Sequence, residues 1–235
     1  IVYTAKVKWR GLLIHYNAYM VVYADGKTES VSAMSKVEPP VLKENLLTWK
    51  WRNLEGTWYG SAEGIREDLL NNDLGKIDWN CFFPLAKAEI KISNKLFTGN
   101  GYCEKMEMSI PPWKLPINEL YWGRFVSNNT YITWIEWKGP QPKKTLFING
   151  KRTDNFELSN HGIVFGVNQL KFLSPKQVRK GNLASTVFKS FGWVKRIFPV
   201  KSLYMKEYKY TSGGELYTNG TLTEKGKTIY ERVVL

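Results

Sequence analysis

Short runs in which apolar and polar residues alternate recur along most of the chain. This period of two is typical of strands with one buried face, and the runs are rich in the aromatic and β-branched residues that favour strands. The pattern predicts an all-β protein built from antiparallel hairpins. The clearest predicted strands cover residues 12–23, 28–34, 46–51, 77–83, 86–92, 96–108, 119–126, 131–138, 215–223 and 228–235.

Turn residues separate several of these runs. Asp25-Gly26 and Asn219-Gly220 supply the positive φ angles that tight hairpin turns require, and Lys225-Gly226 is a weaker signal of the same kind. One segment breaks the pattern, because residues 65–74 place Ile65, Leu69 and Leu70 on one face of a short predicted helix. Residues 183–198 fit either a basic amphipathic helix or two strands, and the all-β context favours strands.

The proline-rich link 111–116 is the clearest seam in the chain. It separates two sets of strands of roughly equal length, and each set is long enough to form its own β-structure around a common interface. We therefore predict two halves, residues 1–112 and 113–235.

The chain is strongly basic. Its 34 lysines and arginines exceed its 21 acidic residues and give a formal net charge of +13, which attracts anions such as an anionic membrane surface. Aromatic residues interleaved with basic ones also suit a single-stranded nucleic acid. However, the aromatics lie inside alternating strands and neither an RNP-like nor a zinc-finger motif is present, so nucleic acid is not favoured as a partner.

Few side chains could hold a metal ion. The two histidines, His15 and His161, are far apart in sequence, and the two cysteines are too few for a four-thiolate zinc site. Cys81 and Cys103 could form one disulfide bond. We therefore predict no metal site.

The segment 99–108 carries the most informative pattern. As a strand, it would place Tyr102, Glu104, Met106 and Met108 on one face, which is apolar except for the carboxylate. Removal from water favours the protonated form of such a glutamate, the form that can donate a proton to an alkene or a carbonyl. The alternative is that Glu104 is structural and pairs with a cation such as Arg124.

An ordered set of short motifs between Asp78 and Phe125 resembles the central signature of the hydroxyneurosporene synthase and AttH-like family, which includes tocopherol-cyclase-like proteins. The motifs are Asp78-Trp79-Asn80, Gly99-x-Gly101-Tyr102-x-Glu104-Lys105, Pro112 and Leu120-Tyr121-Trp122-Gly123-Arg124-Phe125. The resemblance implies two tandem lipocalin-like, calycin-type antiparallel β-barrel halves packed together around a hydrophobic pocket. It also implies hydration or cyclisation of isoprenoids and polyenes without a metal or an organic cofactor.

Two functional hypotheses follow. In the first, Glu104 is the catalytic acid of a cofactor-independent cyclase or hydratase that acts on an isoprenoid, a polyene or a similar apolar molecule, while the faces of the nearby tryptophans stabilise developing positive charge. In the second, the same pocket carries a lipid or pigment without chemistry. The predicted substrate-binding residues are Trp79, Asn80, Tyr102, Trp122, Arg124 and Trp134.

Overall fold

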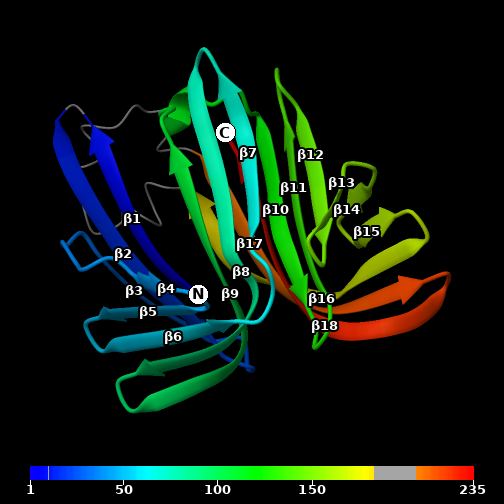
Figure 1. Ribbon diagram of the computed structural model, residues 1–235, viewed down its shortest axis with the longest axis horizontal. Coiled ribbons are helices and arrows are strands. Elements are labelled where there is room, and N and C mark those ends of the chain that lie inside the picture. The colour runs from blue at the N-terminus through cyan, green and yellow to red at the C-terminus, as the bar shows by residue number, and fades with distance from the viewer. Residues whose placement is uncertain (10, 183–204) are drawn as a thin grey trace.

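The computed structural model describes residues 1–9, 11–182 and 205–235, and within them it confirms the prediction of an all-β protein (Figure 1). The ambiguous segment 183–198 lies outside the described residues. A short 3-10 helix, η1 (Pro112–Lys114), follows the last strand of the predicted N-terminal half. No helix in the described part of the chain is both long enough and apolar enough to span a membrane.

The first nine strands form two antiparallel sheets. The smaller sheet has the order β1-β2-β3, and its strands are β1 (Val2–Trp9), β2 (Leu12–Val22) and β3 (Thr28–Ala33). The larger sheet has the order β4-β5-β6-β8-β7, and β9 also pairs with β8. Its strands are β4 (Val41–Lys43), β5 (Leu46–Trp51), β6 (Leu54–Gly60), β7 (Ile65–Asn72), β8 (Gly75–Ile92) and β9 (Lys95–Met108).

The remaining strands form one sheet of order β13-β12-β11-β10-β18-β17-β16-β15-β14. These strands are β10 (Glu119–Val126), β11 (Tyr131–Lys138), β12 (Lys143–Ile148), β13 (Lys151–Thr153), β14 (Glu157–Ser159), β15 (Gly162–Phe165), β16 (Asn168–Asn182), β17 (Lys206–Thr218) and β18 (Thr221–Val234). Each strand pair in the described residues joins strands on the same side of residue 113. The division into residues 1–112 and 113–235 stays a prediction, and this separation of the sheets favours it.

Three apolar cores hold the sheets together. One lies within the N-terminal strands and contains Trp49, Trp51 and Trp58. A second lies within the C-terminal sheet and contains Trp134 and Phe172. The third joins side chains of β7 and β8 to side chains of β10, β11 and β12, and its members include Ile65, Leu69, Ile77, Trp79, Trp122, Ile135, Trp137 and Phe147. This third cluster, which we call the central core, is where the two sets of strands pack together.

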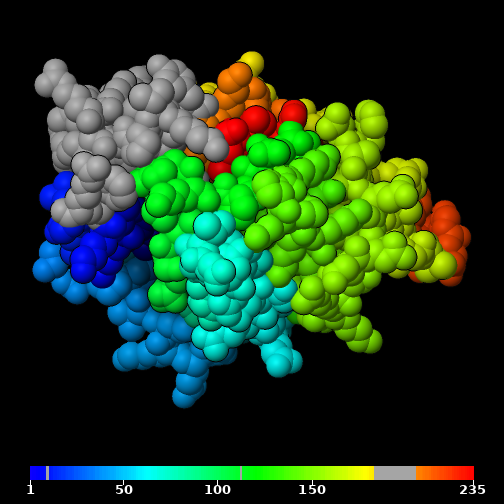
Figure 2. Space-filling view, turned by 90° about the horizontal axis from the view of Figure 1, so that it is seen from above, coloured from blue at the N-terminus to red at the C-terminus, as the bar shows by residue number. Residues whose placement is uncertain are grey.

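Polar contacts surround part of the central core. The Glu67 carboxylate on β7 forms ion pairs with Lys143 at 2.9 Å and with Arg152 at 3.0 Å, both on the C-terminal sheet. In Figure 2 the cyan residues of the N-terminal strands lie directly beside the green residues of the C-terminal sheet. An apolar centre with a polar rim is typical of a specific protein interface.

The predicted helix at residues 65–74 is wrong, because most of this segment is strand β7. The pairing of β7 with β8 is irregular between Asp68 and Leu70. A bulge inserts one residue into a strand and changes which face the next side chain meets. Both Leu69 and Leu70 are therefore buried, and the resulting spacing imitates a helical face.

The other local signals have mixed outcomes. Asn219 and Gly220 have φ angles of 51° and 78° and form the turn between β17 and β18, as predicted. Lys225-Gly226 is not a turn, because it lies inside β18. Residues 77–83 and 86–92 belong to one strand, β8, whose pairing with β9 shifts on both sides of Phe83, next to Pro84. Proline has no backbone N–H to donate to a ladder, which explains the break in the predicted pattern.

Gly123 offers a test of the packing beneath β10. A Cβ atom at this position would lie against the ring of Trp134 and the Cβ atom of Tyr230, whereas a Cβ atom at Gly99 in β9 would meet nothing within 4 Å. We expect Gly123→Ala to lower the free energy of unfolding by about 1–3 kcal/mol through overpacking. Urea denaturation would measure this change, with Gly99→Ala as the matched control. Equal stability of the two variants would contradict the packing described here.

Candidate functional site

The candidate site lies where β8, β9 and β10 bring their side chains to one edge of the central core. Cys81 of β8 lies opposite Glu104 of β9, so their side chains share a face of the sheet. Trp79, two residues before Cys81, points to the same face. Tyr102 precedes Glu104 by two residues on β9 and joins the same face, as the sequence pattern predicts.

Trp79 holds the Glu104 carboxylate directly. The Trp79 Nε1–H donates a hydrogen bond of 2.8 Å to Glu104 Oε2. The Trp79 side chain is completely buried, and its ring lies 5.9 Å from the ring of Phe147 across the central core. The hydrogen bond therefore connects the packing between the two sets of strands to the position of the carboxylate.

Arg124 of β10 supplies the positive charge that faces Glu104. Its Nη2 lies 3.6 Å from Glu104 Oε2, a distance that gives an ion pair but is too long for a hydrogen bond. The guanidinium stacks over the Tyr102 ring and lies 5.3 Å from the centre of the Trp122 ring. The structure therefore contains the cation that the structural explanation of Glu104 requires.

The protonation of Glu104 depends on opposing effects. Burial raises the pKa of this carboxyl, while the positive charge of Arg124 and the hydrogen bond from Trp79 lower it, and the net result is a pKa above the ordinary value. The side chain still keeps 26% of its exposure, so the carboxyl is enclosed without being sealed from solvent. Burial also raises the pKa of Tyr102, which keeps the phenol neutral.

A second buried cluster, not found from the sequence, lies near the first. Lys209 of β17 forms ion pairs with Glu231 of β18 at 2.7 Å and with Glu207 at 3.6 Å, and it donates a hydrogen bond to the hydroxyl of Tyr3 on β1. Although burial opposes its charge, these partners raise the pKa of Lys209 above its ordinary value. The fields of Lys209 and Glu231 also reach Glu104, so the two clusters are electrostatically linked.

The structure brings some of the predicted site residues together and separates others. Trp79, Tyr102, Glu104, Trp122 and Arg124 are mutual neighbours. Their roles in binding or catalysis stay predictions, since contacts alone do not test them.

Asn80 and Trp134 lie apart from this group. Asn80 lies opposite Lys105 of β9 in the strand register. Because side chains alternate along β8, the Asn80 side chain points away from the face that carries Trp79. Trp134 packs in the core of the C-terminal sheet, with its ring 5.6 Å from the ring of Phe172. The hydrogen bonds, ion pairs and ring contacts found for Glu104 and Arg124 involve neither residue, so neither predicted role gains support from the geometry.

The face of β9 that carries Glu104 is more exposed to solvent than the sequence pattern predicts. Met106 and Met108 share the face of Glu104, yet they are 50% and 43% exposed. The cysteines on the neighbouring positions are free thiols rather than a disulfide, and both are buried. Burial raises the pKa of each thiol to about 12, so both remain protonated and unreactive at neutral pH.

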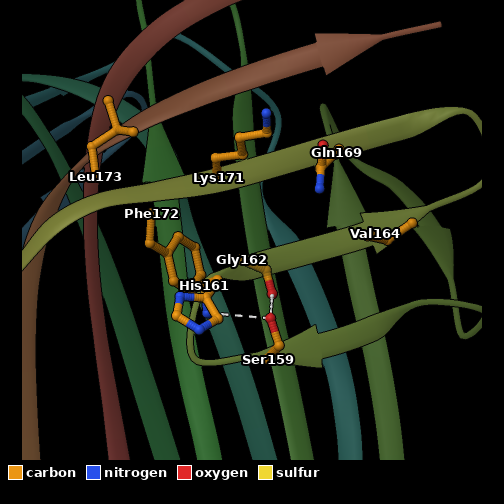
Figure 3. Close-up of a pocket in the computed structure, with 8 residues that line it drawn as sticks. All are labelled: Ser159, His161, Gly162, Val164, Gln169, Lys171, Phe172 and Leu173. Atoms are coloured by element: carbon orange, nitrogen blue, oxygen red, sulfur yellow. Dashed lines mark hydrogen bonds between the residues drawn. The ribbon is translucent and has the colours of Figure 1, made fainter. Parts of the chain in front are cut away.

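A shallow cavity of about 280 Å³ lies elsewhere, on β14, β15 and β16 (Figure 3). Ser159, His161 and Lys171 line it. The Ser159 hydroxyl donates a hydrogen bond to the Gly162 carbonyl and accepts one from the His161 backbone N–H, so it is not hydrogen-bonded to the His161 imidazole. The cavity therefore holds no activated nucleophile, and it contains none of the predicted site residues. In residues 1–9, 11–182 and 205–235, no three His, Cys, Asp or Glu side chains gather to form a metal site.

Comparisons with known proteins support the fold. No protein-family profile matches the chain, and no curated protein matches its sequence. Among solved structures, an AttH-type protein from Nitrosomonas europaea superposes with a TM-score of 0.58 at 7% identity, over 94% of this chain and 80% of that one. Kievitone hydratase from Nectria haematococca superposes with a TM-score of 0.57 at 9% identity, over 99% of this chain and 82% of that one.

These similarities confirm the predicted fold class. The chain has an all-β fold of curled antiparallel sheets that include a half-barrel, in agreement with the lipocalin-like double barrel expected from the motif resemblance. At such low identity the comparison shows the fold alone, and the chemistry must be argued from the side chains of this protein.

The hydrogen bond from Trp79 can be tested through stability. It stabilises the ionised form of Glu104, so its contribution is present above the pKa of Glu104 in the folded protein and is lost as the pH falls through that value. We expect Trp79→Phe to cost about 1.5–3 kcal/mol more at a pH above the pKa of Glu104 in the folded protein than at a pH below it, the usual range for a hydrogen bond to a charged group.

Urea unfolding at both pH values would measure this difference. Trp134→Phe is the control, because Trp134 is equally buried but gives no hydrogen bond to Glu104. A cost of Trp79→Phe that does not depend on pH would contradict the assigned bond.

Proposed function

We propose that the protein is a cofactor-independent enzyme that hydrates or cyclises an apolar small molecule, such as an isoprenoid or polyene, with Glu104 as its acid. One observation carries the proposal. Glu104 is a largely enclosed carboxyl whose pKa is raised, and a hydrogen-bond donor, Trp79, and a cation, Arg124, are already in place for its conjugate base. Such a group can give up a proton and recover it without a change in its surroundings.

The geometry suits a specific sequence of steps. The Glu104 hydroxyl transfers its proton to a carbon–carbon double bond, and positive charge develops on the substrate. Trp79 Nε1–H and Arg124 then stabilise the carboxylate that remains. The face of Trp122 stabilises the positive charge by cation–π attraction, since Arg124 already covers a face of Tyr102. Attack by water or by an internal nucleophile, which loses its own proton to Glu104, completes hydration or cyclisation and restores the acid.

The alternative function is a carrier for a lipid or pigment. The ion pair between Arg124 and Glu104 favours it, because such pairs also serve to neutralise charge in a protein interior. A carrier would bind its ligand in the same place and release it unchanged. Peripheral association with an anionic membrane, which the net charge of +13 favours, is compatible with either function.

Organic extraction and native mass spectrometry of the freshly purified protein would identify a bound apolar molecule. Incubation of that molecule with the wild-type protein and with Glu104→Gln then tests the acid. We expect turnover to fall by at least about a hundredfold in Glu104→Gln, the usual contribution of a general acid, with affinity nearly unchanged. Glu107→Gln is the matched control, because Glu107 lies on the same strand but is exposed and pairs with Lys105.

Two results would contradict the enzymatic function. A molecule recovered unchanged after incubation with the wild-type protein would favour the carrier. Turnover that persists in Glu104→Gln would show that another group supplies the proton.

A further inference from the structure

Arg124 is the least satisfied polar side chain in the described part of the chain. It is 2% exposed, and its Nε, Nη1 and Nη2 atoms have no hydrogen-bond partner there. Guanidinium carries five N–H donors in a planar fork that matches two oxygen atoms. A buried charge without hydrogen bonds is costly, and such a group calls for an acceptor.

Lys209 provides the contrast. It is buried to a similar degree, yet Glu231, Glu207 and the Tyr3 hydroxyl surround its ammonium group. The neighbouring guanidinium of Arg179 is matched as well, with its Nε at 3.4 Å from Glu207. Among the described residues, the Thr145 hydroxyl is the one other buried side-chain group without a hydrogen-bond partner, and Arg124 is the one such group that carries a charge.

The charge of Arg124 is balanced by one carboxylate. Glu104 is the one carboxylate with which Arg124 forms an ion pair among the described residues. When Glu104 is protonated, as the proposed chemistry requires, the buried guanidinium loses its counter-ion. The acid form of the site is thus one positive charge out of balance, and an anionic oxygen at Arg124 would restore neutrality.

We propose that Arg124 binds a carboxylate or enolate oxygen of the substrate, so that the substrate is an apolar molecule with an anionic oxygen head group rather than a pure hydrocarbon. This inference rests on the proposed function, since it assigns the substrate class of the same site. The head group reaches the guanidinium past Glu104, whose side chain is the more exposed of the two. The reactive double bond then lies next to the acid.

Binding of the head group and protonation of Glu104 are coupled. A negative charge beside Glu104 favours its neutral form, so the bound anion raises the pKa of the acid. Binding therefore takes up a proton wherever free Glu104 is ionised, and affinity falls as the pH rises above that point. The charged and titratable groups that interact with Glu104 are Arg124 on β10, Cys81 on β8, Tyr102 and Cys103 on β9, Lys209 on β17 and Glu231 on β18.

Three acyclic monoterpenes with different head groups test this inference: geranic acid, geraniol and the hydrocarbon myrcene. Quenching of tryptophan fluorescence would report binding, because Trp79 and Trp122 flank the site. We expect the wild-type protein to bind geranic acid at least tenfold more tightly than geraniol or myrcene, a difference of about 1.4 kcal/mol. At pH values where the geranic acid carboxyl is already ionised, this preference should decline with rising pH.

The variants separate the roles of the two side chains. Arg124→Met should abolish the preference for geranic acid and leave the affinity for myrcene unchanged, while Arg66→Met, on the exposed side of β7, should keep the preference. Arg124→Lys keeps the charge without the fork, and we expect an intermediate preference. Glu104→Gln imitates the protonated acid, so it should retain the preference and lose the pH dependence.

Several results would overturn the inference. These are equal binding of the three molecules by the wild-type protein, binding of none of them, or a preference that survives in Arg124→Met. The wild-type pH dependence requires no variant, so a failure of Arg124→Met to fold does not prevent the test. If the preference for geranic acid holds but Glu104→Gln retains turnover, the role of Arg124 in binding the anionic head group is supported and the role of Glu104 as the catalytic acid is contradicted.

Discussion

The packing of Trp79 between the two sets of strands is the constraint on which the candidate site depends. Its indole ring is fully buried against Phe147 from the C-terminal sheet, and its one polar atom donates to Glu104. A tryptophan buried with a hydrogen-bond partner gains both apolar contact and a satisfied N–H. The same contact that joins the halves therefore fixes the carboxyl, and a change in how they pack would move it.

The electrostatics follow from this placement. A carboxylate in full contact with an arginine fork is an ordinary strong ion pair with a lowered pKa. Here the guanidinium stacks on Tyr102 and meets Glu104 only at 3.6 Å, so burial outweighs attraction and the acid form is favoured. The Nε, Nη1 and Nη2 atoms of Arg124 have no hydrogen-bond partner in residues 1–9, 11–182 and 205–235. Glu104 and Arg124 are thus too far apart to form the hydrogen-bonded ion pair that would satisfy both side chains.

Alternation along the strands predicted much of this picture from the sequence. It placed Tyr102 and Glu104 on one face, and the ordered motifs around Trp79 and Arg124 indicated that β8, β9 and β10 carry the site. Alternation does not say which partner a strand will meet. Trp134 lies opposite Gly123 and not opposite Trp122, so its side chain points to the other face of the C-terminal sheet and packs in a separate core.

Long-range pairing also explains the remaining surprises. Lys209 appears in the sequence as one of many lysines, and only the approach of β1 and β18 to β17 makes it a buried cation. The helix predicted at residues 65–74 was wrong because a bulge in β7 produced helical spacing in a strand. Local periodicity cannot anticipate a bulge, since pairing with β8 creates it.

The central claim is that Glu104 holds a proton at a pH where an ordinary glutamate has lost it. Infrared difference spectra between the wild-type protein and Glu104→Gln, recorded across a pH series, would report this directly through the carbonyl stretch of the protonated carboxyl. The structure predicts a Glu104 band that persists above the ordinary glutamate pKa of about 4.3. A band lost at or below that pKa would show that Glu104 is an ordinary ion-pair carboxylate and would contradict its assignment as the acid.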